Sequence, residues 1–260
     1  MRVLGVPISL VDLPRAQAIV CEWATAPRPR TVFVREVASL MLAVDHPPLM
    51  RLHEQADMIV ADGAPLAWIG RLRGHGAEIG RIPGADLLDA VCAASLTTGQ
   101  SHYFYGGKPG VAERMAEKLS ARYPGLKVAG LYSPPMREIG ADFELSPEGV
   151  AEIEAVRASG ADFVWVGISS PKQEYWMMRA APIVGRGVFF GVGAAFDFHS
   201  GAVARAPAWM RTNGLEWLHR LCSEPRRLWR RYLVLGPRFV WRLLTARTAG
   251  GAVATAPSGE

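Results

Sequence analysis

The sequence predicts an α/β protein, a Rossmann-like parallel sheet with helices on both faces, followed by a basic helical appendage. Short runs of β-branched and aromatic residues alternate with longer amphipathic stretches from Arg2 to about Phe198, an order typical of doubly wound sheets. Several runs lack strict apolar–polar alternation, as expected for strands that are covered on both faces. The composition changes after about residue 204, where arginines become frequent, and this change indicates the appendage.

The six predicted strands are short and apolar. They lie at 31–34, 58–61, 102–107, 126–131, 162–168 and 187–193. The stretches between them have the length and spacing of helices, and we expect helices near 11–26, 36–56, 64–73, 84–98, 108–122, 147–158 and 171–181. Because parallel strands end at one edge of a sheet, the residues that follow them should gather where doubly wound proteins bind ligands.

Length, charge and cysteine content limit the class of protein. The chain has 260 residues, half of them hydrophobic, which allows a large buried core. No apolar run approaches the ~18 residues that a membrane-spanning helix requires, and the interrupted apolar start does not resemble a signal peptide. Three widely separated cysteines without a CxxC pair fit a reducing cytoplasm. Neither HExxH nor Asp-x-Asp occurs, so we expect no metal and no other cofactor.

Positive charge is concentrated near the C-terminus. Residues 205–247 contain ten arginines and two glutamates, a net charge of +8, which leaves −3 for the rest of a chain whose net charge is +5. We therefore divide the chain into an α/β domain at 1–204, a basic helical appendage at 205–247 and a disordered tail at 248–260. Because Pro225 and Pro237 interrupt the appendage, we expect two or three short helices there.

The arginines of the appendage alternate with tryptophan, leucine and tyrosine, a mixture that suits a membrane interface. At about 1 kcal/mol per basic residue near anionic lipid, a net charge of +8 gives nominally about 8 kcal/mol, which screening reduces. We therefore expect an anionic membrane surface as a partner and a peripheral position on the cytoplasmic face of the membrane. The alternatives are a solvated helix face and a nucleic-acid surface, and the apolar residues argue against nucleic acid.

Two strand ends carry residues that suit chemistry. Asp62 and a glycine follow the strand at 58–61, and the alternative to a chemical role is an Asx-type turn. Gly106, Gly107 and Lys108 follow the strand at 102–107, where glycines let a phosphate approach the backbone and a helix start supplies N–H donors. The alternative there is a tight strand-to-helix turn.

A third strand end repeats this pattern. In VGISSPKQEYW, Gly167 ends a strand, and Lys172 and Gln173 begin a helix. Two such loops on neighbouring strands would hold a diphosphate between them. The alternative is a capped helix, with Ser170 as N-cap and Gln173 as its capping-box partner.

Seven segments carry a resemblance to known proteins. They are ADGAPLAWIGRLRG (61–74), GRIPGADLL (80–88), YGGKPGVAERMAEKL (105–119), YPGLKVAG (123–130), VWVGISSPKQEYWM (164–177), GVGAAFDFHSG (191–201) and RAPAWMRTNGLEWLHRLCSEPRRLWRRYL (205–233). In this order they resemble the WecG/TagA/CpsF family of bacterial glycosyltransferases. The resemblance implies an inverting, metal-independent transfer of a sugar from a UDP-sugar donor, typically UDP-N-acetylmannosamine, to an undecaprenyl-diphosphate-linked saccharide. It also implies that the appendage approaches the membrane and helps to complete the site.

The resemblance assigns roles to individual residues. Asp62 falls on the general base and Gln173 on the glutamine of the Pro-Lys-Gln-Glu motif, and we count both as catalytic. Arg81, Asp86 and Asp197 fall on positions that bind the nucleotide-sugar. From the pattern at the strand ends, we add five further residues to the predicted nucleotide-sugar site: Gly106, Gly107, Lys108, Gly167 and Lys172. Arg220, Arg227 and Arg230 fall on the basic appendage, toward the acceptor and the membrane. The base takes the proton of the attacking hydroxyl, typically worth ~10²–10⁴ in rate, while N–H groups and cations stabilise the departing diphosphate.

One segment departs from the family. Val34, Glu36 and Ala38 stand where the family usually has threonine or asparagine, so the identity of the sugar is open. The acceptor glycan, the linkage and the formation of a homo-oligomer are open as well. The alternative function is a non-catalytic nucleotide-binding scaffold of a polysaccharide assembly complex.

Overall fold

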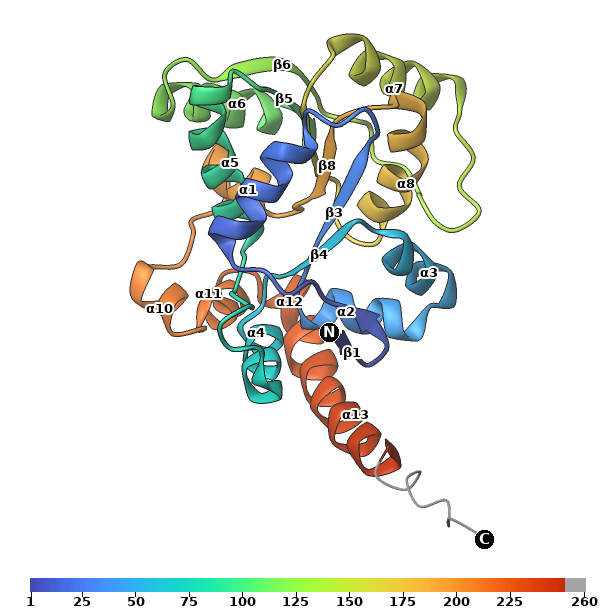
Figure 1. Ribbon diagram of the computed structural model, residues 1–260, viewed down its shortest axis with the longest axis vertical. Helices are drawn as coiled ribbons and strands as arrows, with labels where there is room; N and C mark the ends of the chain where they lie inside the picture. Colours follow the sequence, from blue (N-terminus) through green and yellow to red (C-terminus); the bar gives the residue numbers. More distant parts are fainter. Residues whose placement is uncertain (251–260) are drawn as a thin grey trace, which may run out of the picture.

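The computed structural model describes residues 1–250, with side chains as far as Ala246 (Figure 1). Its centre is a six-stranded sheet. The strands are β3 (Arg30–Arg35), β4 (Met58–Ala61), β5 (Ser101–Gly106), β6 (Lys127–Tyr132), β7 (Phe163–Gly167) and β8 (Val188–Gly191). Every predicted strand is found, with small differences at the ends, and the predicted α/β class is confirmed.

The sheet is parallel throughout, in the order β4-β3-β8-β7-β5-β6. All six carboxyl ends therefore lie at one edge, and the strands later in the chain insert between the earlier pairs, as in doubly wound folds. A short antiparallel hairpin, β1 (Arg2–Val3) and β2 (Val6–Pro7), precedes the sheet.

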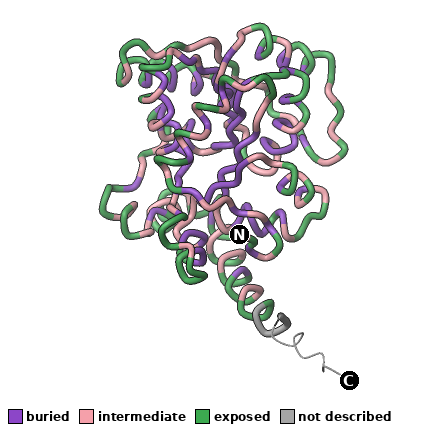
Figure 2. Tube along the Cα trace, in the orientation of Figure 1, coloured by how far each residue is buried: buried purple, intermediate pink, exposed green. Residues whose placement is uncertain are grey.

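Helices cover both faces of the sheet (Figure 1). On one face lie α2 (Val37–Asp45), α3 (Pro47–Gln55), α7 (Pro147–Ser159) and α8 (Lys172–Val184), and on the other lie α1 (Leu13–Trp23), α5 (Gly84–Thr98) and α6 (Val111–Arg122). Successive strand residues alternate between the two cores: Phe33 packs on the first face, and Val32 and Val34 pack on the second. Figure 2 shows the strands as the buried centre of the molecule.

The single helix predicted over 36–56 is wrong, because two helices occupy that stretch. α2 ends at Asp45 and α3 begins at Pro47. His46 between them has an extended backbone, with φ −127° and ψ 97°. A residue that precedes proline avoids the helical region because the proline ring would clash with it.

The appendage contains α10 (Ala208–Thr212), α11 (Glu216–Ser223), α12 (Pro225–Trp229), η2 (Arg230–Val234) and α13 (Leu235–Gly250). Pro225 begins a helix, as proline at a first helical position allows. The prediction that Pro237 interrupts the helix is wrong: residues 225–250 are helical throughout. The turn at η2 is a π-helix, in which the Leu235 N–H donates to the Arg230 carbonyl. Such a widened turn relieves the clash that proline causes inside a regular helix.

Ion pairs attach α13 to the sheet domain. Arg238 donates to Asp45 at the end of α2 over 2.5 and 3.1 Å, and Arg242 contacts the same carboxylate at 2.8 Å. Phe239 between them is buried. Beyond this contact α13 extends away from the body (Figure 1). In the part of the chain described, no helix combines the length and apolar character needed to cross a bilayer.

The predicted disordered tail covers residues 248–260. Residues 248–250 are the last residues of α13. Residues 251–260 lie outside the described part of the chain.

Candidate active site

A cavity of about 590 Å³ lies at the carboxyl ends of β3, β4, β7 and β8. The sheet domain forms one wall, and the appendage forms the other through α11, α12, η2 and α13. The predicted site residues that line the cavity are Asp62, Arg81, Gly107, Gly167, Gln173, Asp197, Arg220 and Arg227. Residues at the ends of β4, β5 and β7 therefore meet at this cavity. Within the described residues, no three His, Cys, Asp or Glu side chains come close enough to hold a metal ion.

Asp62 stands directly after β4, and its N–H donates to the Arg35 carbonyl at 2.8 Å, which continues the pairing of β3 with β4. Gly63 is the N-cap residue of the next helix, α4 (Ala64–Gly70), and no side chain accepts a hydrogen bond from the first N–H groups of this helix at the cap. Among the residues described here, no group donates a hydrogen bond to the Asp62 carboxylate, so the Asx-type turn does not form. Its side chain faces the cavity instead.

The surroundings of Asp62 favour its protonated form. Burial raises the pKa of this carboxyl from 3.8 to about 6. The positive charges of Arg81 and Arg220 lower this pKa, while Glu216 and Glu36 raise it. A carboxylate with this pKa is a stronger base than an ordinary aspartate and is still ionised near neutral pH.

Gln173 lies in the first turn of α8 and is almost fully buried. Its amide nitrogen occupies space that a side chain at Gly191 would fill. Its Oε1 is buried without a hydrogen-bond partner in the described structure. The alternative reading of this loop, a capping box between Ser170 and Gln173, does not apply, because Pro171 is the N-cap and the Ser170 hydroxyl accepts from Arg35 at 3.1 Å.

A buried ion pair lies next to Gln173 in the first turn of α8. Arg35 at the end of β3 donates to Glu174, the residue after Gln173, and both side chains are almost inaccessible to solvent. Removing one partner of such a pair leaves an uncompensated buried charge, which typically costs about 3–5 kcal/mol. Arg35 and Glu174 thus fix the carboxyl end of β3 relative to the start of α8.

Arg81 connects the Asp62 loop to the appendage. Its guanidinium donates to the carbonyls of Asp62 at 2.8 Å and of Arg211 at 2.6 Å, and to the carboxylate of Glu216. Asp86 lies outside the cavity lining and accepts from Arg205 at 2.6 Å. Arg81 and Asp86 therefore both bind the appendage in this structure, and of these two residues only Arg81 also lines the cavity.

The glycine-rich strand ends are explained in part by close packing. Gly106 has φ 138°, and a side chain there would collide with the backbone of Gly167. Gly107, with φ 77°, and Gly167 both line the cavity beside the ring of Phe196 in α9 (Ala195–Ser200). A side chain at Gly167 would collide with that ring.

The two predicted lysines point elsewhere. Lys108 is exposed and outside the cavity lining. Lys172 donates to the Arg137 carbonyl at 2.8 Å and to Glu138 at 3.0 Å, also away from the cavity. The structure therefore brings glycines from both loops to the cavity but neither lysine.

Arginines of the appendage supply positive charge to the cavity. Arg220 stacks on Phe198 at 5.5 Å, and its buried Nε has no hydrogen-bond partner in the described residues. Arg220 also forms no ion pair there, whereas Arg227 pairs with Glu224 at 2.6 Å. Arg230 is exposed, lies over its neighbour Trp229 at 5.3 Å and does not line the cavity.

Asp197 also lines the cavity, near the start of α9. Burial raises the pKa of its carboxyl, and the positive charge of Arg227 opposes this change. Asp62 and Asp197 are therefore two cavity carboxyls whose surroundings disfavour ionisation.

Sequence reasoning treated Glu36 only as a departure from a family pattern. The structure shows that it caps α2, accepting the backbone N–H groups of Ser39 at 2.7 Å and Ala38 at 3.0 Å, while the Ser39 hydroxyl accepts the Glu36 N–H. Its carboxylate also receives Arg231 of η2 at 2.8 Å. Burial alone would raise the pKa of Glu36, but Arg231 and the two backbone N–H groups lower it overall. This capping box has the residue order Glu-x-x-Ser, the reverse of the usual Ser-x-x-Glu, so the usual pattern could not reveal it.

Fold and site together define a class: a doubly wound α/β protein with a ligand cavity at the carboxyl edge of its sheet, closed by a C-terminal segment. Residues 1–252 match the family described as Glycosyl transferase WecG/TagA/CpsF family, and the chain belongs to this family. The resemblance found from the sequence motifs is confirmed, and membership supports a role in glycosyl transfer.

Proposed function

We propose that this protein transfers N-acetylmannosamine or a related sugar from a UDP-sugar to a polyprenyl-diphosphate-linked saccharide, with inversion, at the cytoplasmic face of the membrane. One observation carries the proposal. Asp62, a carboxylate without a hydrogen-bond donor, and Arg220, a guanidinium without an acidic partner, line the same cavity among the described residues. A base and an anion-binding group are what this transfer requires.

Asp62 acts as the general base. The acceptor hydroxyl loses its proton to the Asp62 carboxylate as its oxygen attacks the anomeric carbon, and the bond from that carbon to the UDP oxygen breaks with its electron pair. UDP leaves from the opposite side, so the configuration inverts. A pKa of about 6 suits this role because Asp62 is ionised at pH 7.5 and binds a proton more strongly than an ordinary aspartate.

Arg220 and Arg227 face the charge that develops on the leaving diphosphate. Both line the cavity, and Arg220 has no competing carboxylate within ion-pair distance in the structure described. The Gln173 amide offers a further polar contact, because its buried Oε1 lacks a partner. The cavity volume of about 590 Å³ falls in the range of about 300–1,000 Å³ that is common for small-molecule sites.

The appendage supports an acceptor that is held in a membrane. Its exposed apolar side chains are Trp209, Trp217, Leu218, Trp229, Leu233, Val234, Val240, Trp241 and Leu244. Exposed tryptophans next to arginines suit the level of the lipid headgroups. Since the same segment lines the cavity, membrane attachment would bring the active site to a lipid-linked substrate.

A donor screen tests the proposed function. Purified full-length protein is incubated with a set of UDP-sugars and a synthetic polyprenyl-diphosphate saccharide in vesicles, with and without EDTA. We expect one UDP-sugar to extend the lipid-linked saccharide at equal rates in both conditions. UDP binding without transfer to any acceptor would favour a nucleotide-binding scaffold instead.

A further inference from the structure

Among the large apolar side chains exposed on the sheet domain, two lie only four residues apart. Trp68 in α4 has half of its surface exposed, and Leu72 in η1 (Arg71–His75), the helical turn that follows, is 84% exposed. Isolated exposed leucines are common on protein surfaces. A tryptophan and a leucine four positions apart lie on the same side of a helix, however, and together they form one apolar surface.

Helix α4–η1, residues 64–75, begins at the wall of the cavity. Ala64 and Pro65 at its start line the cavity. The loop between α10 and α11 packs against it, because a Cβ at Gly214 would lie 3.1 Å from Ala64 and 3.4 Å from the Trp68 ring. Its exposed side chains are therefore neighbours of those on the appendage.

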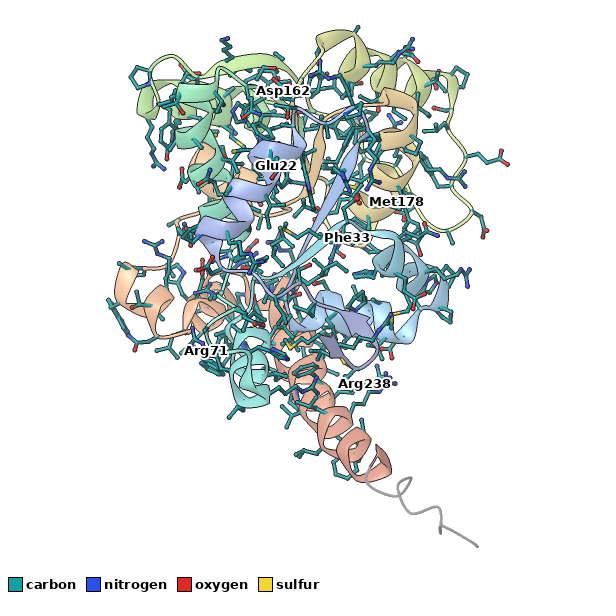
Figure 3. The ribbon with its side chains drawn as sticks, viewed as in Figure 1. Glu22, Phe33, Arg71, Asp162, Met178 and Arg238 are labelled. Carbon is teal, nitrogen blue, oxygen red and sulfur yellow. The ribbon has the colours of Figure 1, made fainter. Side chains whose placement is uncertain are left out.

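The figures place both groups at the same end of the molecule. In Figure 1, α4, α10, α11 and α13 lie together below the sheet. In Figure 3, Arg71 of η1 and Arg238 of α13 are labelled at this end, and Asp162 is at the opposite end. One surface can thus contact both helix α4–η1 and the appendage.

The charge around Trp68 and Leu72 is positive. Residues 63–77 include Arg71 and Arg73, both exposed, and contain no aspartate or glutamate. Arg71 forms no ion pair in the described structure, and Arg73 donates to the Arg2 carbonyl at 2.5 Å. The acids that flank this stretch are Asp62, which lines the cavity, and Glu78, which lies 3.3 Å from His75. Arginine beside exposed tryptophan and leucine is complementary to an anionic lipid surface.

We propose that helix α4–η1 is a second membrane contact, which inserts Trp68 and Leu72 at the boundary between headgroups and acyl chains beside the appendage. The partner is a bilayer that contains anionic phospholipid. Contacts from the sheet domain and from the appendage fix the orientation of the protein, so the cavity mouth faces the lipid. This proposal rests on the proposed function for its purpose, but it is tested by lipid binding alone.

The test is co-sedimentation of the full chain with vesicles of equal parts phosphatidylglycerol and phosphatidylcholine. The variant Trp68→Ser/Leu72→Ser should partition about tenfold more weakly, which corresponds to about 1.4 kcal/mol. Leu96→Ser is the matched control, because Leu96 is 41% exposed near the end of α5. Since α5 runs antiparallel to the strands, this end lies at the edge of the sheet opposite to the cavity. The control should bind vesicles as the wild type does.

A second measurement does not depend on affinity. Brominated lipids quench the fluorescence of tryptophans that enter the bilayer. The wild-type chain has eight tryptophans, and in Trp68→Phe the part of the fluorescence that these lipids quench should be smaller than in the wild type. Unchanged sedimentation of the double variant together with unchanged quenching in Trp68→Phe would overturn the proposal. If the double variant instead converts a dimer to a monomer in sedimentation velocity without loss of vesicle binding, a second copy of the chain covers this surface and the proposal fails.

The outcome is separable from that of the proposed function. With a water-soluble, short-chain acceptor and no vesicles, the double variant should transfer sugar at the wild-type rate. If the wild-type protein transfers no sugar but the double variant still loses vesicle binding, the membrane contact stands and only the glycosyl-transfer proposal fails.

Discussion

Arg231 in the appendage donates two hydrogen bonds, of 2.8 and 3.2 Å, to the carboxylate of Glu36 at the end of β3. Glu36 also caps α2, so a single carboxylate orders a helix start and holds the segment that closes the cavity. The negative charge of Glu36 in turn raises the pKa of Asp62. Glu36 is thus coupled to both the appendage and the proposed base.

Neutralising Glu36 should loosen the appendage. In Glu36→Gln the side-chain amide can still cap α2, but the charged contact with Arg231 is lost. We expect faster proteolytic cleavage within residues 225–250 and a coupling of about 1 kcal/mol between Glu36→Gln and Arg231→Met in a double-mutant cycle of urea unfolding. The estimate is small because part of the Arg231 side chain is solvent-exposed. Arg226→Met, an exposed arginine of the same segment, is the control. Additive effects of the two substitutions would show that the pair does not hold the appendage.

Replacing the proposed base should abolish turnover and spare donor binding. Asp62→Asn removes proton acceptance without changing the side-chain shape, and kcat should fall about 10²- to 10⁴-fold. UDP affinity, measured by calorimetry, should stay within about threefold of the wild-type value, because the proposed diphosphate contacts are arginines. Near-normal turnover of this variant would exclude Asp62 from the mechanism.

The wild-type rate should depend on pH in the direction set by Asp62. Its pKa of about 6 means that the carboxylate is the main form above pH 6 and the acid is the main form below. We therefore expect kcat/KM, which reports the pKa values of the free enzyme, to be level from about pH 7 to 8 and to fall tenfold per pH unit below about 6. A profile that stays flat down to pH 5 would contradict this assignment.

The same residue should cost stability. Folding raises the pKa of Asp62 from 3.8, so the folded protein holds this proton more tightly than the unfolded chain. The free energy of unfolding then falls as pH rises from about 4 to 6 and stays lower above that range. Asp62→Asn, which carries no charge, should be about 1–3 kcal/mol more stable than the wild type at pH 7.5. Urea unfolding at pH 7.5 and pH 4.5 measures this gain, which should shrink at the lower pH.

The layered fold was predictable from local signals. The strands other than the edge strand β6 are runs of mainly apolar residues that alternate between two buried faces, and such runs are visible in a single sequence. The break at His46 and the continuous helix through Pro237 were missed for opposite reasons. The first is a local effect of Pro47 that the amphipathic pattern obscured, and the second depends on a π-turn that no residue type announces.

Site residues divide in a similar way. Asp62, Gln173 and Arg220 line the cavity as the motifs indicated. The pairings were not predictable, because partners far apart in sequence make them: Arg81 binds Glu216, and Glu36 binds Arg231. Lys108 fitted a phosphate-binding pattern, yet it lies in the turn before α6, exposed and outside the cavity lining.

Arg220 and Arg230 offer a matched test of the anion-binding side of the cavity. Both are appendage arginines that stack on an aromatic ring, but only Arg220 lines the cavity. A hydrogen bond to a charged group contributes about 1.5–3 kcal/mol, so Arg220→Ala should weaken UDP binding about tenfold to a hundredfold. Arg230→Ala should leave it unchanged and reduce only vesicle binding, because its guanidinium faces solvent. Calorimetric titration of UDP without lipid separates the two effects, and equal losses in both variants would mean that general positive charge, rather than a placed guanidinium, attracts the nucleotide.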